Sequence, residues 1–214
     1  MKFGASPANR SVNSAESLVS YLPVHDDEAL VRCIVQGRQG ATDALFRKYV
    51  DHVRRVIVSV LDIDSETEDV IQDVFLDAIR SINQLKDPSL LGPWLTRIAV
   101  FKSRRVIRRR TRTRWLRFVA PEQLEGLSKL RSRIDAPEAV LCTYLVLGEL
   151  SARDRIVFGL RYISGMELTE VADACQISVA TVKRHLQRAE EKFARKASKY
   201  PALRSRLGGG RLRP

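Results

Sequence analysis

The chain has 214 residues, and 44% of them are hydrophobic, so it can bury a core, which argues against wholesale disorder. Its 37 Lys and Arg outnumber its 25 Asp and Glu, and the formal charge of +12 favours a polyanionic partner, either nucleic acid or an anionic membrane surface. Membrane insertion and secretion are not expected, because no apolar run approaches about 18 residues and the first stretch lacks the apolar core of a signal peptide.

Residues 26–115 have the pattern of an N-terminal helical domain. Asp26-Asp27-Glu28 places negative charge where a first helix would begin, and Gly37 can end that helix. A second helix has hydrophobic residues three or four positions apart, at Leu45, Tyr49, Val53, Val56 and Val60. A third has them at Val70, Ile71, Val74, Phe75, Ala78, Ile79, Ile82 and Leu85. Asp87-Pro88-Ser89 breaks it, and Gly92-Pro93 begins a fourth helix, since proline is tolerated at the first helical position.

Charge is segregated within this domain. Residues 62–77 carry no base and seven acids, namely Asp62, Asp64, Glu66, Glu68, Asp69, Asp73 and Asp77. Residues 97–117 carry ten bases and no acid. One polyanion would repel the first stretch and attract the second, so the two stretches are expected to meet different partners.

The remaining chain divides into a leader, a linker, a second domain and a tail. Residues 1–25 are rich in Ser, Asn and Ala and are expected to be a disordered leader. Residues 116–135 contain Pro, Gly and mixed charges, as a flexible linker does. A second helical domain is predicted over residues 136–200, followed by a basic flexible tail over residues 201–214.

The sharpest local pattern is a helix-turn-helix in the second domain. Leu168, Val171 and Ala172 predict a short helix, and Cys175-Gln176-Ile177 fits a tight turn. Ser178 is a good N-cap for a longer helix whose inner stripe is formed by Val179, Val182, Leu186, Ala189 and Phe193. The second helix of such a pair can enter the major groove of DNA.

The outer face of this longer helix carries groups that suit base edges. At 100° per residue, Arg184 leaves the helix about 200° away from Val182, and Gln187 and Arg188 share its outer half. Arg and Lys suit guanine edges, whereas Gln suits adenine. The alternative interpretation is a solvated basic helix face with no ligand.

The pattern as a whole is all-α: two small helical domains joined by a flexible linker, the second ending in a helix-turn-helix. Four stretches in order give the chain a resemblance to a known family: Asp27-Glu28-Ala29-Leu30-Val31 followed by Gly37, Glu68-Asp69-Val70-Ile71-Gln72-Asp73-Val74-Phe75, Trp94-Leu95-x-Arg97-Ile98-Ala99, and Ser178-Val179-Ala180-Thr181-Val182-Lys183-Arg184-His185-Leu186. With them the chain resembles a bacterial RNA polymerase sigma factor of the extracytoplasmic-function (ECF) group of the sigma-70 family. The acidic Glu-Asp-x-x-Gln-Asp-x-Phe stretch is the specific part, since many regulators have a helix-turn-helix.

The resemblance implies a protein that binds core RNA polymerase and directs promoter-specific transcription initiation, without cofactor or metal. It implies core-polymerase binding through Glu68, Asp69, Gln72, Asp73 and Phe75. It implies binding of the downstream promoter element through Trp94, Arg97, Phe101, Lys102, Arg104, Arg105, Arg108 and Arg109. It implies binding of the upstream element through Ser178, Thr181, Lys183, Arg184, Gln187 and Arg188. An anti-sigma factor is a further implied partner, bound to inner domain faces that the linker leaves open.

Phe101 departs from the family pattern, which usually has Asn after Ile-Ala-x. Phe101 shares a helical face with Trp94 and Ile98, so its ring is either a stacking surface for bases or part of the core. The sequence leaves these two interpretations open.

Two other classes of function are alternatives to a polymerase subunit. A helix-turn-helix regulator acting without being a polymerase subunit would need a ligand-binding or phospho-acceptor domain, and residues 26–110 show only helical patterns. An enzyme acting on nucleic acid would need a catalytic constellation, and an RNA-binding protein would need a sheet with exposed aromatics. The sequence has neither pattern, and it has no Walker loop and no nucleophile elbow, so no enzymatic activity is expected. His25, His52 and His185 share no metal-ligand spacing with Cys33, Cys142 and Cys175. The cysteines are interpreted as small core residues of a cytoplasmic protein.

Overall fold

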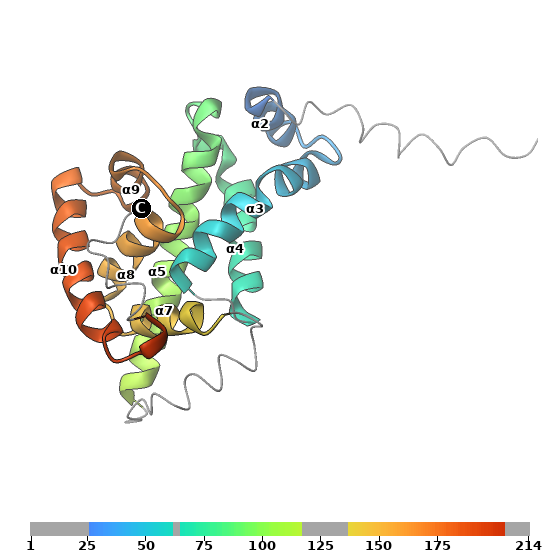
Figure 1. Cartoon of the computed structure of the whole chain (residues 1–214). Helices are drawn as coiled ribbons and strands as arrows, with labels where there is room; N and C mark the ends of the chain where they lie inside the picture. Colours follow the sequence, from blue (N-terminus) through green and yellow to red (C-terminus); the bar gives the residue numbers. More distant parts are fainter. Residues whose placement is uncertain (1–25, 62–64, 117–136, 204–214) are drawn as a thin grey trace, which may run out of the picture.

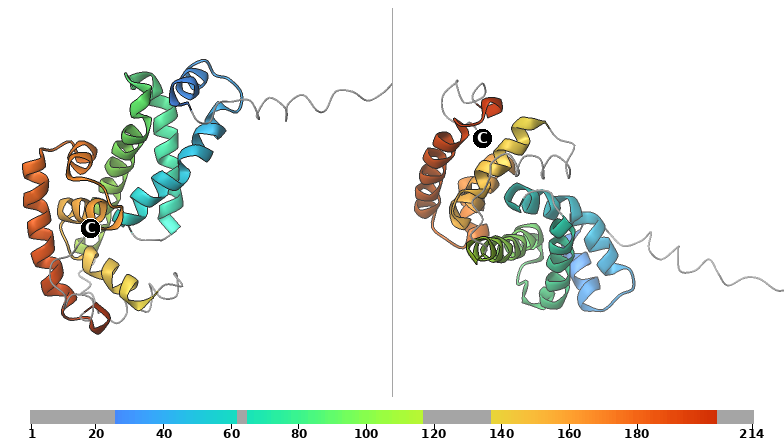
Figure 2. Two further views of the ribbon diagram at one scale, coloured as in Figure 1. Left: turned by 45° about the horizontal axis from the view of Figure 1, so that its top comes forward. Right: turned by 90° about the horizontal axis from the view of Figure 1, so that it is seen from below.

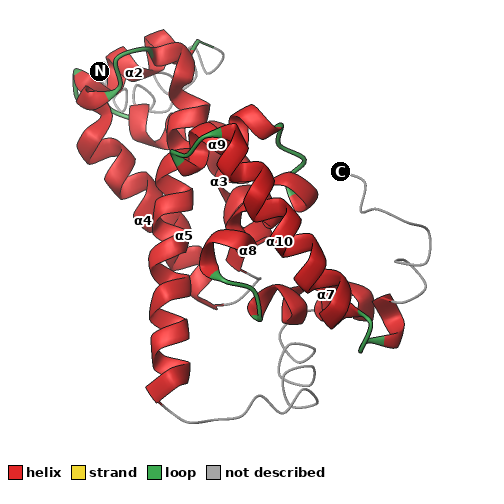
Figure 3. Cartoon of the chain, turned by 90° about the vertical axis from the view of Figure 1, so that its left-hand side faces the viewer, coloured by secondary structure: helices red, strands yellow, loops and turns green. Residues whose placement is uncertain are grey.

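Every element of regular structure in the described part of the chain is helical (Figure 3). The computed structural model describes residues 26–61, 65–116 and 137–203. The predicted leader lies outside the described residues, as do the predicted linker and tail apart from a few residues at their edges. The all-α prediction is confirmed for the part that is described.

The N-terminal unit consists of four α-helices, with two short 3-10 turns before the last one (Figure 1). They are α2 (Asp27–Val35), α3 (Ala41–Leu61), α4 (Ser65–Ser81), the turns η1 (Ile82–Gln84) and η2 (Pro88–Leu90), and α5 (Leu91–Leu116). The Asp26 carboxylate caps α2 by accepting a hydrogen bond from the backbone N–H of Glu28 at 2.9 Å. Gly37, at a φ of 64°, follows the end of this helix as predicted.

The third predicted helix is shorter than its hydrophobic pattern indicated. It was expected to continue to Leu85, but α4 ends at Ser81 and gives way to a 3-10 turn. The Ser81 hydroxyl donates to the carbonyl oxygen of Asp77 at 2.6 Å. Such a bond competes with the backbone ladder and favours a change of helix type at this point.

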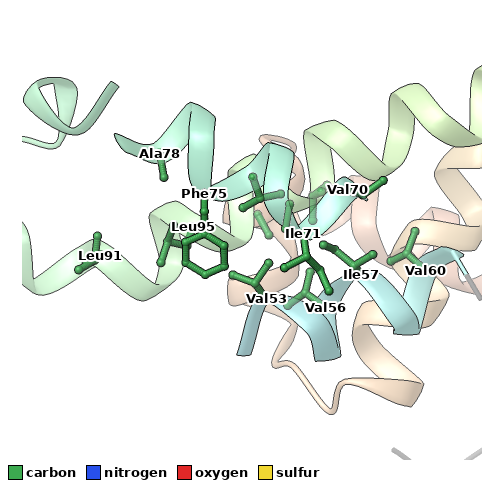
Figure 4. Packing of buried hydrophobic residues seen from close by; sticks show 14 of the residues in the cluster. Val53, Val56, Ile57, Val60, Val70, Ile71, Phe75, Ala78, Leu91 and Leu95 are labelled. Atoms are coloured by element: carbon green, nitrogen blue, oxygen red, sulfur yellow. The ribbon is translucent and has the colours of Figure 1, made fainter. Parts of the chain in front are cut away.

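The core of the N-terminal unit lies where α3, α4 and α5 meet (Figure 4). The buried side chains labelled there come from all three helices: Val53, Val56, Ile57, Val60, Val70, Ile71, Phe75, Ala78, Leu91 and Leu95. Full burial of one such Leu or Ile side chain stabilises the fold by about 1.5–3 kcal/mol. The helical spacing read from the sequence therefore identified this core correctly.

The C-terminal unit contains α7 (Glu138–Gly148), α8 (Ala152–Phe158), the π-helical turn η3 (Gly159–Ile163), α9 (Leu168–Cys175) and α10 (Val179–Ala197). The predicted helix-turn-helix is α9 and α10. Gln176 makes the tight turn between them in the left-handed region, at a φ of 55°. The Ser178 hydroxyl caps α10 by accepting from the backbone N–H of Thr181 at 3.2 Å.

The two units pack against each other, with α5 between them. In the right-hand view of Figure 2, α5 is seen nearly end-on, with the N-terminal helices on one side and α8 to α10 on the other. Leu160, Val171 and Val182 of the C-terminal unit belong to the same buried cluster as Val100 of α5. The prediction of open inner faces was wrong, since apolar residues of both units lie in one buried cluster. Burial removes these residues from water, which favours the packed arrangement.

Candidate nucleic-acid interface

An acidic face on α4 consists of Glu68, Asp69, Gln72 and Asp73, all of which are exposed. Glu68 pairs with Arg54 of α3. Asp73 lies 3.9 Å from Lys102 of α5, but that ammonium group is closer to Asp77, at 2.6 Å. Arg54 engages both carboxylate oxygens of Glu68, so Asp69 and Asp73 are the acids of this face most available to another molecule.

Phe75 does not belong to this exposed face. Its side chain is only 5% exposed, and its ring centroid lies 4.9 Å from that of Phe46. The proposed role of Phe75 in contacting polymerase is therefore corrected to a packing role beneath the acidic face.

The bases of α5 divide into three groups according to what they face. The first group faces α4: Lys102 is 12% exposed and pairs with Asp77, while Arg109 and Arg110 both hydrogen-bond to Glu66, at 2.6 and 2.7 Å. The hydrogen bond from Arg110 is the main reason that the pKa of Glu66 is lowered. Lys102 therefore pairs with the acids of α4, and its predicted role in binding the downstream promoter element is corrected to this intramolecular pairing.

The second group forms an exposed stripe on α5. Phe101, Arg105 and Arg108 are exposed at helical spacing, and Arg112 continues the stripe. Phe101 is 58% exposed, which excludes the interpretation of this ring as core. Trp94, by contrast, is half-buried and packs on the core. Arg112 was missed as a candidate, although its spacing of four residues from Arg108 was the pattern that could have found it.

The third group faces the C-terminal unit. Arg97 and Arg104 are partly buried, and within the described residues the Nε atom of each is buried without a hydrogen-bond partner. Arg104 lines a cavity of about 280 Å³ together with Arg153 and Thr181. Burial, together with the nearby charges of Arg108 and Arg153, lowers the pKa of Arg104.

The outer face of α10 agrees with the helical projection made from the sequence. Ser178, Lys183, Arg184, Gln187 and Arg188 are exposed, whereas the predicted inner residues Val182, Leu186, Ala189 and Phe193 are buried. The exception is Thr181, which is half-buried at the cavity that Arg104 lines. Most of the predicted contact residues of this helix are therefore brought together on one accessible surface.

A buried carboxylate, that of Asp154, organises the edge of this surface. Asp154 is 2% exposed, and its oxygens lie 2.8 Å from His185 Nδ1, 3.5 Å from Arg188 Nη2 and 3.6 Å from Lys192 Nζ. Burial alone would raise the pKa of Asp154, but the hydrogen bonds from His185 and Ser151 and the two positive charges outweigh it and lower the pKa. His185 is buried, as the sequence indicated, while Asp154 was missed because its partners lie more than 30 residues away.

The three cysteines of the described chain are free thiols that are buried or half-buried. Cys33 and Cys142 are buried, and Cys175 is half-buried. Burial raises the pKa of the Cys175 thiol to about 11, so it is protonated near neutral pH. Among the residues of the described ranges, no three His, Cys, Asp or Glu side chains are grouped as metal ligands would be. In the same ranges no helix is both long and apolar enough to span a membrane.

Two models of one protein family match the chain, Sigma-70 region 2 over residues 45–113 and Sigma-70, region 4 over residues 141–193. The RNA polymerase sigma-H factor of Pseudomonas aeruginosa is 27% identical over 180 residues, covering 79% of this chain and 93% of that protein. The RNA polymerase sigma factor NccH of Alcaligenes xylosoxydans xylosoxydans is 29% identical over 174 residues, with coverage of 78% and 92%. The ECF RNA polymerase sigma-E factor of Escherichia coli is 26% identical over 175 residues, with coverage of 77% and 91%.

The chain belongs to the sigma-70 family, in its ECF group. As a sigma factor it binds core RNA polymerase and directs promoter-specific transcription initiation. Region 2 covers α3 to α5, and region 4 covers the helices that end in the helix-turn-helix.

Two solved structures share the fold of this sigma factor. CnrH in complex with the cytosolic domain of CnrY superposes with a TM-score of 0.56 at 24% identity, covering 81% of this chain and 98% of that one. RpoE in complex with the anti-sigma factor NepR from Bartonella quintana gives a TM-score of 0.53 at 20% identity, with coverage of 74% and 97%.

Proposed function

We propose that this sigma factor assigns its three tasks to three helices: α4 binds core polymerase, α5 binds the downstream promoter element, and α10 recognises the upstream element. One observation carries this division. Three exposed acids, Glu68, Asp69 and Asp73, cluster on one face of α4, whereas exposed bases line α5 and α10. A surface meant for a protein and a surface meant for DNA are expected to differ in this way.

The acidic face of α4 suits a basic surface of the polymerase. Asp69, Gln72 and Asp73 match family positions that dock on a basic coiled coil of the large subunit, and all three are exposed here. Carboxylates in such an interface form charge-assisted hydrogen bonds with arginines. Phe75 of the same helix is buried, so we assign it a packing role and not a contact with polymerase.

The exposed stripe of α5 suits DNA whose strands have separated. Arg105, Arg108 and Arg112 are placed to bind phosphates, which supplies affinity independent of sequence. The exposed ring of Phe101 offers a surface on which an unpaired base can stack, a contact worth about 1–3 kcal/mol. This combination fits an element that is melted during initiation.

The outer face of α10 suits base edges in the major groove. Arg184 and Gln187 are exposed near the N-terminal half of the helix, the part that enters the groove in a helix-turn-helix. Arg can bind guanine and Gln can bind adenine through paired hydrogen bonds. Ser178 and Lys183 flank them and are placed for phosphate contacts that fix the register.

The protein acts by binding alone, with no cofactor, in the cytoplasm where core polymerase works. An anti-sigma factor is a further proposed partner. What supports it is that both structural neighbours are complexes, CnrH with the cytosolic domain of CnrY and RpoE with the anti-sigma factor NepR.

Transcription with purified components tests the proposed function. Core polymerase is incubated with fragmented genomic DNA, with and without the purified chain, and the 5′ ends of the transcripts are sequenced. The expected result is a set of start sites that depends on the chain and shares two upstream sequence elements. A set of start sites unchanged by the chain would contradict the proposal and favour a regulator that binds DNA without joining polymerase.

A further inference from the structure

The cavity of about 280 Å³ that Arg104 lines lies where α5, α8, α9 and α10 meet. Its charged lining is one-sided, because Arg104 of α5 and Arg153 of α8 both lie on it and no Asp or Glu is among the described residues that line it. His185 lines it too, but its ring is already bonded to the buried Asp154. Two arginines therefore share this cavity with no acid beside them in its described lining.

Arg104 is destabilised in this position. Its Nε atom is buried and has no hydrogen-bond partner within the described residues, and a buried donor left without a partner weakens a fold. Burial, together with the like charges of Arg108 and Arg153, also lowers the pKa of its guanidinium group. An anion that lay between Arg104 and Arg153 and accepted a hydrogen bond from this Nε atom would offset both effects.

The remaining lining indicates what kind of anion fits. Gln176 and Thr181 supply polar groups from the helix-turn-helix, while Val100, Ile156 and Ile177 supply apolar ones. Such a mixture is typical of sites for small organic molecules, in which a few polar groups fix the orientation of the ligand. Guanidinium groups bind phosphate through paired hydrogen bonds. The lining therefore suits a phosphate ester with a small apolar part better than a bare ion.

Close packing on the N-terminal unit holds the α8 wall of this cavity in place. A Cβ atom placed on Gly159, directly after α8, would lie 2.2 Å from the backbone oxygen of Ser59 in α3, so the two backbones approach closely. In α8 itself, Arg155 Nε donates to the backbone oxygen of Val60 at 2.5 Å, and the next residue, Ile156, lines the cavity. A site whose walls are already fixed loses less entropy when a ligand binds.

We propose that this cavity is a binding site for a small phosphorylated organic molecule, held by Arg104 and Arg153 between α5 and the helix-turn-helix. The phosphate group lies between the two guanidinium groups, and the organic part lies against Val100 and Ile177. The proposal concerns the free chain and does not rest on the DNA contacts proposed for α5 and α10. Because a ligand that binds only the folded state stabilises it, binding is expected to raise the melting temperature of the chain.

Phenyl phosphate is the probe, and calorimetric titration of the full-length chain measures its binding. We expect one molecule to bind per chain, and phenol, which lacks the phosphate group, to bind at least tenfold more weakly. Arg153→Gln should weaken the binding of phenyl phosphate at least tenfold, and Arg153 is exposed, so the fold should tolerate the change. Arg104→Gln should have an effect at least as large. The matched control is Arg55→Gln, which removes the same charge from an exposed site on α3 outside the described lining and should change the affinity less than twofold.

Alkylation of Cys175 by iodoacetamide locates the bound probe. Cys175 lines the cavity, and its thiol reacts slowly because burial keeps it protonated. Saturating phenyl phosphate should slow its alkylation at least fivefold further, whereas labelling of the buried Cys33 and Cys142 should not change. A single-stranded DNA decamer at the same concentration of phosphate groups should give no such protection. Equal protection by the decamer would show that the cavity takes DNA phosphates, and it would overturn the proposal of a small-molecule site.

Three further results would overturn the proposal: no saturable binding of phenyl phosphate, equal binding of phenol, or unchanged affinity in both Arg153→Gln and Arg104→Gln. Failure of the proposed function would show itself differently, as the absence of chain-dependent start sites, and would leave the titration and the alkylation results unaffected.

Discussion

The two basic helices of this sigma factor, α5 and α10, use their positive charge in different ways. On α5 the bases are shared among three surroundings: the acids of α4, the interface with the C-terminal unit, and solvent. On α10 one buried carboxylate, Asp154, draws His185, Arg188 and Lys192 to one edge, and the remaining polar face stays exposed. The number of bases in a helix is thus a poor measure of the charge that DNA can reach.

The difference matches the two kinds of DNA contact that we propose for these helices. A helix that binds phosphates needs a few accessible charges and tolerates loss of the others to packing. A helix that recognises bases needs its side chains at fixed positions, and a buried anchor such as Asp154 supplies that rigidity. Each prediction below breaks or sharpens this comparison.

The largest effect is expected from Asp154→Asn. Removing one partner of a buried ionic cluster leaves the other charges without compensation, which destabilises proteins by about 3–5 kcal/mol. We expect the free energy of unfolding in urea to fall by about 3 kcal/mol, at the lower end because Arg188 and Lys192 are partly exposed. Glu191→Gln, an exposed change on the same helix, is the control and should cost less than about 0.5 kcal/mol. Equal stability of the Asp154→Asn variant and the wild type would show that Asp154 is not the anchor of α10.

Charge reversal on α4 is expected to act on polymerase binding alone. Asp73→Arg places a cation opposite the basic polymerase surface, and close charge pairs across interfaces contribute about 1.5–7 kcal/mol. We expect the affinity for core polymerase to fall at least tenfold in a competition assay, with the helical circular dichroism unchanged. Asp51→Arg makes the same charge change at an exposed site on α3 and serves as the control. If both variants bind core equally well, α4 is not the docking surface.

Within α10, Arg184→Ala should affect promoter choice more than Arg188→Ala. Arg184 is exposed and hydrogen-bonds to the Thr181 hydroxyl at 3.3 Å, whereas Arg188 lies within 3.5 Å of both His185 and the buried Asp154. A bidentate base contact discriminates by about 1–3 kcal/mol, so start-site selection should broaden for the first variant. The contact between Arg188 and Asp154 should keep the effect of the second smaller. A larger loss of specificity from Arg188→Ala would reverse this ranking.

Within α5, the exposed Arg108 should matter more than its neighbour Arg109. Both side chains are exposed, but Arg109 hydrogen-bonds to Glu66, while Arg108 lies on the stripe that carries Phe101. Arg108→Ala should weaken holoenzyme binding evenly across promoters and reduce the slope of log affinity against log salt by about 1. Arg109→Ala should change that slope less. Identical slopes for the two variants would mean that the hydrogen bond to Glu66 does not keep Arg109 from binding DNA.

The smallest effect concerns pH. The folded-state pKa of Asp154 is lowered, so its stabilisation is fully present above its unfolded pKa of about 3.9 and is lost as the pH falls through the folded value. The stability difference between wild type and Asp154→Asn should therefore shrink as the pH falls below about 5. Urea unfolding at a series of pH values measures it. A difference that grows as the pH falls below about 5 would contradict the direction of the pKa shift.

Local features were predictable from the sequence, while contacts between distant residues were not. Ser178 and Asp26 cap helices that begin beside them, and the buried stripe of α10 follows from helical spacing, so each could be derived from a short stretch of chain. Helical spacing also predicted the side of α5 on which Lys102 and Phe101 lie. It did not predict which element packs against that side. The environment of Lys102 is set by Asp77 on another helix, and that of Phe101 by the absence of any covering element in the described chain.

The packing of the two units shows the same limit. Gly159 and Ser59 each fit an ordinary helix when considered alone, and only the folded chain brings them together. A flexible linker and open inner faces were therefore reasonable predictions from the sequence. The sequence pattern gave no means of predicting the close approach of the two backbones.

Site-specific crosslinking tests the central claim, that α5 and α10 contact different promoter elements in the holoenzyme. A photoreactive amino acid is placed at position 108 or 184, and the crosslinked nucleotides are mapped on a promoter taken from the transcription experiment. The account predicts crosslinks from position 184 only in the upstream element and from position 108 only in the downstream element near the start site. Crosslinks from both positions to one element, or none from position 184 to DNA, would contradict it.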